Sequence, residues 1–320
     1  MILAFWGALP ARRRPIAAED GATRELLPGD LVTVRSLAEI ASTLDANGEL
    51  GGMPFMAEMA RFCGQSLKVK RRADRTCVEG VGLRRLDGCV ILEDAACDGA
   101  EHDGCQRGCL LFWKEAWLKR AGGAEIAEAP PEFGQSRRQL APQRRGARYV
   151  CQSTELAKAT TEFGGGWKLL VRDLETGELG VSNFAAIALI GLVNRLRARM
   201  GLPEIGIQRG RIGPLGRRAL GLEPGDWVKV KGRRSIRSAL DGRGHNRGLR
   251  FEPEMSLHLG SRRQVERRVE RMIDEQTGKM LELGDTVVLK GVECQGLCMK
   301  NCPRSAAMFW REAWLERAEG

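Results

Sequence analysis

Three cysteines and one histidine lie within one short stretch of the chain. The stretch reads Cys97-Asp-Gly-Ala-Glu-His102-Asp-Gly-Cys105-Gln-Arg-Gly-Cys109. Three thiols and one imidazole are the ligand set of a tetrahedral Cys₃His zinc site. Glycines between them let the backbone wrap around a small ion. The stretch therefore predicts a closed zinc site made by Cys97, His102, Cys105 and Cys109.

A second cluster lies near the other end of the chain and contains no histidine. It reads Cys294-Gln-Gly-Leu-Cys298-Met-Lys-Asn-Cys302. Three thiols with an open fourth position suit zinc, with His258, solvent or a substrate as the fourth ligand. They also suit a [4Fe–4S] cluster, although the spacing is not that of radical SAM enzymes. Buried thiols without a metal are the third alternative, because free cysteine packs like a small hydrophobic residue. Zinc is the preferred prediction for both clusters.

Both clusters belong to an internal repeat. Residues 112–120 read Phe-Trp-Lys-Glu-Ala-Trp-Leu-Lys-Arg and residues 309–317 read Phe-Trp-Arg-Glu-Ala-Trp-Leu-Glu-Arg, an offset of 197 positions. The same offset takes Cys97 to Cys294 and Cys105 to Cys302. Further upstream the offset is 196, and it takes Pro-Gly-Asp at 28–30 to Pro-Gly-Asp at 224–226. Ordered matches over such a length indicate an internal duplication.

Each copy has the pattern of a small β-rich module. Alternating apolar residues predict a strand after each Pro-Gly-Asp turn, at 31–34 and 227–230. A short helix, a glycine-rich turn and two further strands follow. The final Phe-Trp segment is interpreted as a helix, because its two tryptophans are four residues apart and would share one face in the core. The predicted fold is α+β: tandem SH3-like barrels or rolls, each closed by a tryptophan-containing helix and joined by a mainly helical segment.

Composition divides the chain further. The predicted units are a mobile N-terminus (1–22), a first cysteine module (23–122), a linker (123–148), a middle segment (149–220) and a second cysteine module (221–320). In the middle segment, a strongly apolar run at 184–193 precedes Arg195, Arg197 and Arg199. The favoured interpretation is a buried helix that packs the two modules together. The alternative is that the 184–200 helix docks on a membrane surface or a protein partner.

The motifs together resemble those of a family of uncharacterised bacterial proteins. They are Pro-Gly-Asp-x-Val-x-Val, Gly-x-Pro-Phe-Met-x-Glu-Met, Cys-Asp-Gly-x-x-His-x-x-Cys-x-x-x-Cys and Phe-Trp-Lys-Glu-Ala-Trp-Leu. The resemblance implies a shared fold and a shared cysteine-ligated site, and it implies no activity. Cys298 departs from it, since a residue other than cysteine is expected there.

The chain carries a formal net charge of +10, which favours nucleic acid or another polyanion as a partner. Arginines gather among glycines at positions 209, 211, 217 and 218. Phosphate-loop, nucleophile-elbow and His-Glu-x-x-His motifs are absent from the sequence. No stretch reaches the roughly 18 apolar residues of a transmembrane helix, and we expect a cytoplasmic protein. The leading hypothesis is a non-catalytic, metal-binding accessory protein. The alternative is an iron–sulfur or other metal-dependent enzyme or redox protein that uses the second cluster.

Overall fold

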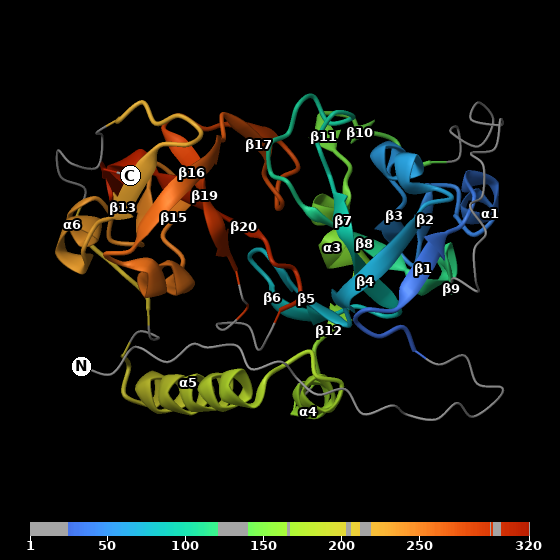
Figure 1. Ribbon diagram of the computed structural model, residues 1–320, viewed down its shortest axis with the longest axis horizontal. Helices are drawn as coiled ribbons and strands as arrows, with labels where there is room; N and C mark the ends of the chain where they lie inside the picture. The colour runs from blue at the N-terminus through green and yellow to red at the C-terminus, as the bar shows by residue number, and fades with distance from the viewer. Residues whose placement is uncertain are drawn as a thin grey trace.

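Two five-stranded sheets form the framework of the protein. The computed structural model describes residues 25–120, 140–164, 167–202, 206–211, 219–294, 296 and 302–319. The predicted mobile N-terminus and most of the predicted linker therefore lie outside the described residues. The fold is mixed α+β, as predicted, with one sheet in each of the two modules (Figure 1).

The two sheets have the same strand order. The first is ordered β8-β7-β4-β1-β9 and the second β20-β19-β16-β13-β21, with antiparallel pairing throughout. In the first module the strands are β1 Leu31–Val34, β4 Ser66–Arg72, β7 Cys89–Ala96, β8 Leu110–Lys114 and β9 Leu118–Arg120. In the second they are β13 Trp227–Val230, β16 Arg262–Arg268, β19 Thr286–Glu293, β20 Ala307–Arg311 and β21 Leu315–Arg317. This agreement supports the duplication that the sequence indicates.

The predicted local elements are confirmed in both copies. In β1, Val32 and Val34 are buried and Leu31 is exposed, the alternation that a strand with one covered face requires. The short helices are α1 Leu37–Ala41 and α6 Arg233–Ser238. Ser36 caps helix α1: its hydroxyl accepts the N–H of Glu39, and the Glu39 carboxylate accepts the N–H of Ser36.

The predicted tryptophan helix is wrong. The Phe-Trp segment of the first copy continues as β8, makes one 3₁₀ turn (η2, Glu115–Trp117) and leaves as β9. In the second copy it runs as β20, η7 Glu312–Trp314 and β21. A turn between two strands brings residues four positions apart to the same core, just as a helix does. The segment forms strands because β8 pairs with β7 and β9 pairs with β1.

The tryptophans form the core, as predicted. The Phe55 ring lies edge-on to Trp117 at 5.2 Å and to Trp113 at 6.2 Å between ring centroids, and all three side chains are fully buried. Phe251 repeats both distances with Trp314 and Trp310. Glu115 and Glu312, which occupy the same position in the two copies, both pair with an arginine, at 2.8 Å from Arg72 and 3.3 Å from Arg268.

Smaller elements complete the modules. The first contains β2 Glu49–Leu50, β3 Met53–Pro54, the 3₁₀ helix η1 Ala57–Phe62, β5 Arg75–Val78 and β6 Gly82–Arg85. In the sequence between the two modules are β10 Arg144–Arg145, β11 Arg148–Tyr149, α3 Gln152–Ala159, β12 Thr161–Glu162, α4 Trp167–Glu175 and α5 Val181–Arg199. The second contains β14 His245–Asn246, β15 Leu249–Arg250, η5 Pro253–His258, β17 Arg271–Ile273 and β18 Met280–Glu282.

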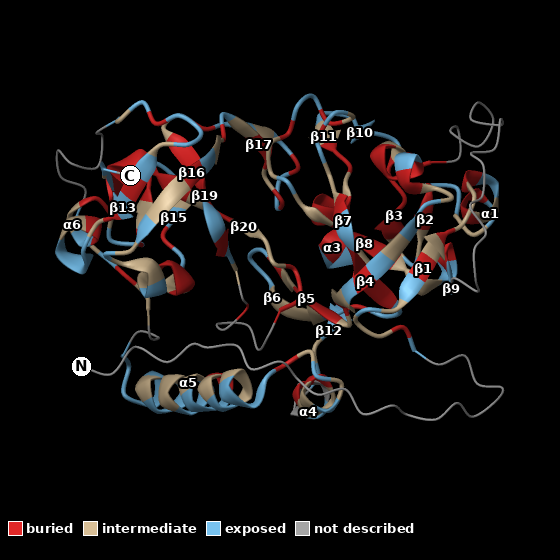
Figure 2. Ribbon diagram, viewed as in Figure 1, coloured by how far each residue is buried: buried red, intermediate tan, exposed pale blue. Residues whose placement is uncertain are grey.

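Helix α5 does not pack the two modules together, so the favoured interpretation of the apolar run is wrong. It runs along one edge of the molecule, beside α4 and below the sheets in Figure 1. Ile187 is its one buried residue, and Figure 2 shows the helix mainly in the colours of exposed and intermediate residues. Its apolar composition therefore predicted a helix correctly and its burial incorrectly.

The modules contact each other directly, through the loops that carry the cysteines. The Cys105 sulfur accepts the N–H of Ile273 at 3.4 Å, and the Cys302 sulfur accepts the N–H of Cys77 at 3.2 Å. The offset of 197 takes Cys105 to Cys302, and the offset of 196 takes Cys77 to Ile273, so the two contacts are made by corresponding residues. Each module therefore docks its cysteine loop on the β5 or β17 strand of the other. Such reciprocal contacts are the pattern of an isologous interface.

Arginines from both loops converge on one carboxylate at this interface. Arg107 donates to the carbonyl of Ile273 at 3.0 Å, and Arg304 donates to the carbonyl of Cys77 at 3.3 Å. The buried carboxylate of Glu275 accepts from Arg304 at 2.5 Å and from Arg107 at 3.2 Å. The contacts hold the second module against the cysteine loop of the first.

Candidate metal centre

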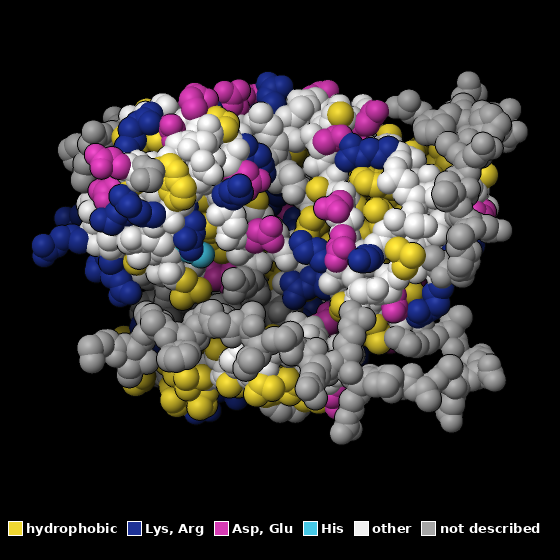
Figure 3. Space-filling view, in the orientation of Figure 1, with side chains coloured by type: hydrophobic (Ala, Val, Ile, Leu, Met, Phe, Trp, Pro, Cys, Tyr) yellow, Lys and Arg dark blue, Asp and Glu magenta, His cyan; other side chains and the backbone are white. Residues whose placement is uncertain are grey.

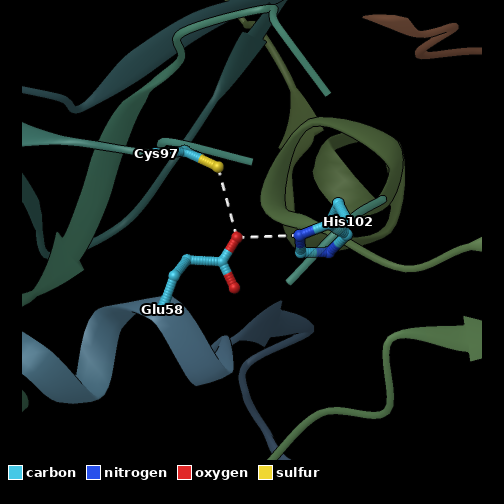
Figure 4. Close-up of side chains that lie close together, drawn as sticks. All are labelled: Glu58, Cys97 and His102. Atoms are coloured by element: carbon cyan, nitrogen blue, oxygen red, sulfur yellow. Dashed lines mark hydrogen bonds and ion pairs between the residues drawn. The ribbon is translucent and has the colours of Figure 1, made fainter. Parts of the chain in front are cut away.

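Three side chains with metal-binding atoms meet in the first module (Figure 4). Glu58 comes from η1, and Cys97 and His102 come from the loop after β7. Oε1 of Glu58 lies 3.2 Å from the Cys97 sulfur and 2.8 Å from Nδ1 of His102. One ligand atom from each residue lies within 4.8 Å of the other two. Tetrahedral zinc bonds of about 2.0–2.3 Å separate neighbouring ligand atoms by roughly 3–4 Å. The Cys97 sulfur already lies at such a separation from Oε1, whereas Nδ1 of His102 lies at hydrogen-bond distance and would move away from Oε1 if an ion entered between them.

The site contains buried polar atoms that lack a hydrogen bond. The side chains of Glu58 and His102 are 2% and 3% exposed. Oε2 of Glu58 and Nδ1 of His102 have no hydrogen bond of acceptable geometry within the described residues. Nδ1 of His102 still has the charge of Glu58 beside it, but Oε2 of Glu58 has no such contact. Leaving a buried atom such as Oε2 unsatisfied costs about 1–3 kcal/mol, and an ion bound to it would remove that cost. The other nitrogen of His102 lies 3.0 Å from the carbonyl oxygen of Val150, which turns Nδ1 toward Glu58.

The charges of the site respond to one another. Burial works to raise the pKa of Glu58, but its contact with His102 outweighs burial and leaves that pKa lowered. Burial works to lower the pKa of His102, and Glu58 leaves it raised. Without a metal the two side chains form an ion pair. Burial and the Glu58 carboxylate both raise the pKa of Cys97, so this thiol keeps its proton until a cation replaces it.

The loop around the site depends on glycine. Gly99 has φ +73°, and a Cβ there would overlap the carbonyl oxygen of Cys105. The turn is closed by the N–H groups of His102 and Gly104, which donate to the carbonyl of Gly99 at 2.9 and 3.0 Å. Left-handed backbone of this kind favours glycine. The predicted use of glycine to wrap the loop is thus seen in the structure.

Further thiols line the cavity beside the site. The cavity has about 20 Å³ of free volume, room for roughly one water molecule or ion. It is lined in part by Cys97, His102, Cys105, Cys109 and Cys151. The backbone of Cys109 pairs with that of Cys97 at 2.8 Å, and the Cys109 sulfur lies 3.3 Å from the Ser153 hydroxyl.

The structure brings together two of the four residues of the predicted Cys₃His set. Cys97 and His102 lie together, Cys109 lines the adjoining cavity, and the sulfur of Cys105 serves the module interface. Glu58 takes a place that the sequence prediction gave to a cysteine. One signal for it was present, because Glu58 lies in the Gly-x-Pro-Phe-Met-x-Glu-Met motif and matches Glu254 in the second copy.

The second cluster is described only in part. Cys294 follows β19, and its N–H donates to Ala306 at 2.9 Å, as the Cys97 N–H donates to Cys109. Cys302 faces Cys77; a hydrogen bond from Cys77 and nearby backbone N–H groups lower the pKa of Cys302 to about 7 against the effect of burial. Cys298 lies outside the described residues. His258, the suggested fourth ligand, packs edge-on to Trp310 at 6.2 Å. A metal held by Cys294, Cys298 and Cys302 stays a prediction.

Comparison with known proteins finds no relative: no family model, no curated protein and no solved structure matches the chain.

Proposed function

We propose that the protein is a non-catalytic, metal-binding accessory protein whose first module binds Zn²⁺ through Glu58, Cys97 and His102. The observation that supports this proposal is the group of three ligand atoms, in which Glu58 and His102 are buried and Oε2 of Glu58 lacks a hydrogen bond. Cys109 is the proposed fourth ligand, since its carbonyl accepts the N–H of Cys97 and the residue lines the cavity beside the site. Four protein ligands make a closed site, which is the structural type.

The donor types favour zinc. Thiolate, imidazole and carboxylate together suit Zn²⁺, whereas Ca²⁺ and Mg²⁺ prefer oxygen ligands alone. An iron–sulfur cluster requires mainly thiolates, and the Glu58 and His102 positions do not supply them. The [4Fe–4S] alternative concerns the second cluster, and a visible spectrum of protein purified without air tests it.

The finer fold and the partner belong to the proposal as well. An SH3-like barrel or roll is proposed for each five-stranded sheet, because a Pro-Gly-Asp turn opens both first strands. A polyanion partner is supported by six exposed arginines that form no ion pair within the described residues: Arg209, Arg211, Arg233, Arg234, Arg237 and Arg243. Figure 3 shows basic side chains over the second module. Binding of nucleic acid that does not weaken as salt rises would contradict this partner.

Metal analysis of single variants tests the zinc site. The full chain is purified, its zinc is measured by elemental analysis, and Co²⁺ is exchanged in to report thiolate bonds by its visible spectrum. Cys97→Ser and Glu58→Gln should each remove one equivalent of zinc and weaken the cobalt spectrum. Cys63→Ser is the matched control, since this cysteine ends the same 3₁₀ helix without reaching the site. Unchanged zinc affinity in Cys97→Ser would exclude the proposed site.

A further inference from the structure

Helix α5 exposes a continuous apolar stripe. Leu189, Leu192, Leu196 and Met200 are spaced by three or four residues and so lie on one face. Leu189 is 62% and Met200 64% exposed. Figure 3 shows apolar side chains gathered along the edge of the molecule where α5 lies. A contiguous apolar patch on a surface marks a contact with a partner or a membrane.

Near the N-terminal end of α5, the side opposite the stripe is covered. Ile187 packs with Leu170 and Leu179, and Phe184 lies beside them, so α4 and α5 form a hairpin with a core of its own. A buried ion pair between Asp173 of the hairpin and Arg75 of β5 ties α4 to the first module. The stripe is thus presented outward by a helix that is attached near its N-terminal end to α4 and, through α4, to the first module.

Both ends of α5 are held by the modules. Beyond its C-terminal end the chain joins the second module, where Gly210 donates its N–H to the carbonyl of Asp241 at 3.0 Å and Gly206 accepts from Ser256 at 3.0 Å. Helix α5 is long and apolar enough to cross a membrane. A helix whose two ends are both tied to folded modules on one side lies along a surface, because spanning would carry one end to the far side.

The charge of α5 points to an anionic surface. No acidic residue occurs between Val181 and Arg199, whereas Arg195 and Arg199 are exposed at the C-terminal end. Each basic residue near an anionic bilayer strengthens binding roughly fivefold. An acidic protein surface would complement the arginines too, but it would not match four apolar side chains in a row along the helix. Acyl chains below anionic headgroups match both features.

We propose that the α5 stripe binds the surface of a lipid bilayer that contains anionic lipids. Leu189, Leu192, Leu196 and Met200 enter the boundary between headgroups and acyl chains, and Arg195 and Arg199 contact the phosphates. The proposal is independent of the zinc site, which lies in the first module.

Sedimentation with vesicles tests the proposal on the full chain. The protein should sediment with vesicles of phosphatidylcholine and phosphatidylglycerol, and much less with phosphatidylcholine alone. Leu189→Ser/Leu192→Ser should weaken binding roughly a hundredfold, since each buried leucine accounts for roughly a factor of ten. Arg195→Gln/Arg199→Gln should weaken it roughly 25-fold. Leu257→Ser is the matched control, because Leu257 is 65% exposed but lies on η5 of the second module. This variant should bind the vesicles as strongly as the wild type.

Two results would overturn the membrane assignment. One is vesicle binding that the α5 variants leave as strong as that of Leu257→Ser. The other is that neither the wild type nor any variant binds vesicles, while the wild type is a dimer in analytical ultracentrifugation and Leu189→Ser/Leu192→Ser dissociates it. The stripe would then be the contact surface for a second copy of the chain. Unchanged thermal unfolding and zinc content in each variant show that the modules remain folded.

Discussion

Replacing Glu275 by glutamine should weaken the contact between the modules far more than the same change at Glu79. Glu275 is buried, and its carboxylate accepts from Arg304 and Arg107 and from the backbone N–H of Glu79. The repeat offset of 196 makes Glu79 its counterpart. The Glu79 side chain is 48% exposed and lies 3.6 Å from Arg107. The two positions thus differ mainly in burial.

The magnitude follows from what each change leaves behind. Burial works to lower the pKa of Arg304, but Glu275 raises it well above its ordinary value, so this arginine stays charged inside the protein. Glu275→Gln leaves that buried charge without a carboxylate, which costs about 3–5 kcal/mol. Glu79→Gln removes a solvent-exposed pair, worth under about 1 kcal/mol. A difference of roughly 3 kcal/mol is therefore expected.

Urea unfolding of both variants, together with calorimetry, measures this difference. Glu275→Gln should lower the free energy of unfolding and broaden or split the calorimetric transition, because the modules then unfold less cooperatively. Glu79→Gln should keep the wild-type transition. If the two variants fall within about 1 kcal/mol of each other, the Glu275 pair does not hold the modules together and the reasoning fails.

Three further changes test the core, the loop and the charges of the site. Phe55→Ala should lower the free energy of unfolding by about 3–5 kcal/mol in calorimetry, and a loss below about 1 kcal/mol would contradict the packing. Gly99→Ala should abolish zinc binding, measured by elemental analysis, whereas Gly104→Ala, with a similar φ but no backbone atom in the way, should keep zinc and cost about 1 kcal/mol. Without metal, the lowered pKa of Glu58 and the raised pKa of His102 should stabilise the fold most between pH 4.5 and 6.5, their ordinary values. That stability is lost as pH falls through the folded pKa of Glu58 or rises through the folded pKa of His102. Stabilisation by added zinc should instead increase with pH. If the urea midpoint of the metal-free protein does not fall at both ends of this pH range, the ion pair is refuted.

The strands could be predicted from the sequence because their signals are local. Val32 and Val34 alternate with exposed neighbours, and the second copy repeats the pattern at Val228 and Val230. The tryptophan segment could not be assigned from spacing. A separation of four residues places Trp113 and Trp117 together in a helix and equally in a strand–turn–strand path, and the choice depends on strands far away in the sequence.

The site could be predicted only where its residues are neighbours in the chain. Cys97 and His102 are five positions apart, whereas Glu58 is 39 positions from Cys97 and is one of many carboxylates. The role of Cys105 was missed because its partner, Ile273, lies 168 positions away in the other module. Likewise, the apolar residues of α5 specify a helix, but they do not specify which neighbours cover it.

The reciprocal docking of the two cysteine loops has a consequence for how the copies can diverge. In a dimer of identical chains, any substitution in the loop would change both loops at once, so metal binding and docking would have to be kept or lost together. One chain with two copies is free of this constraint. The docking cysteines Cys105 and Cys302 are present in both copies, whereas His102 and Cys109 correspond to Met299 and Ala306. One loop is thus able to specialise as the partner that closes the other.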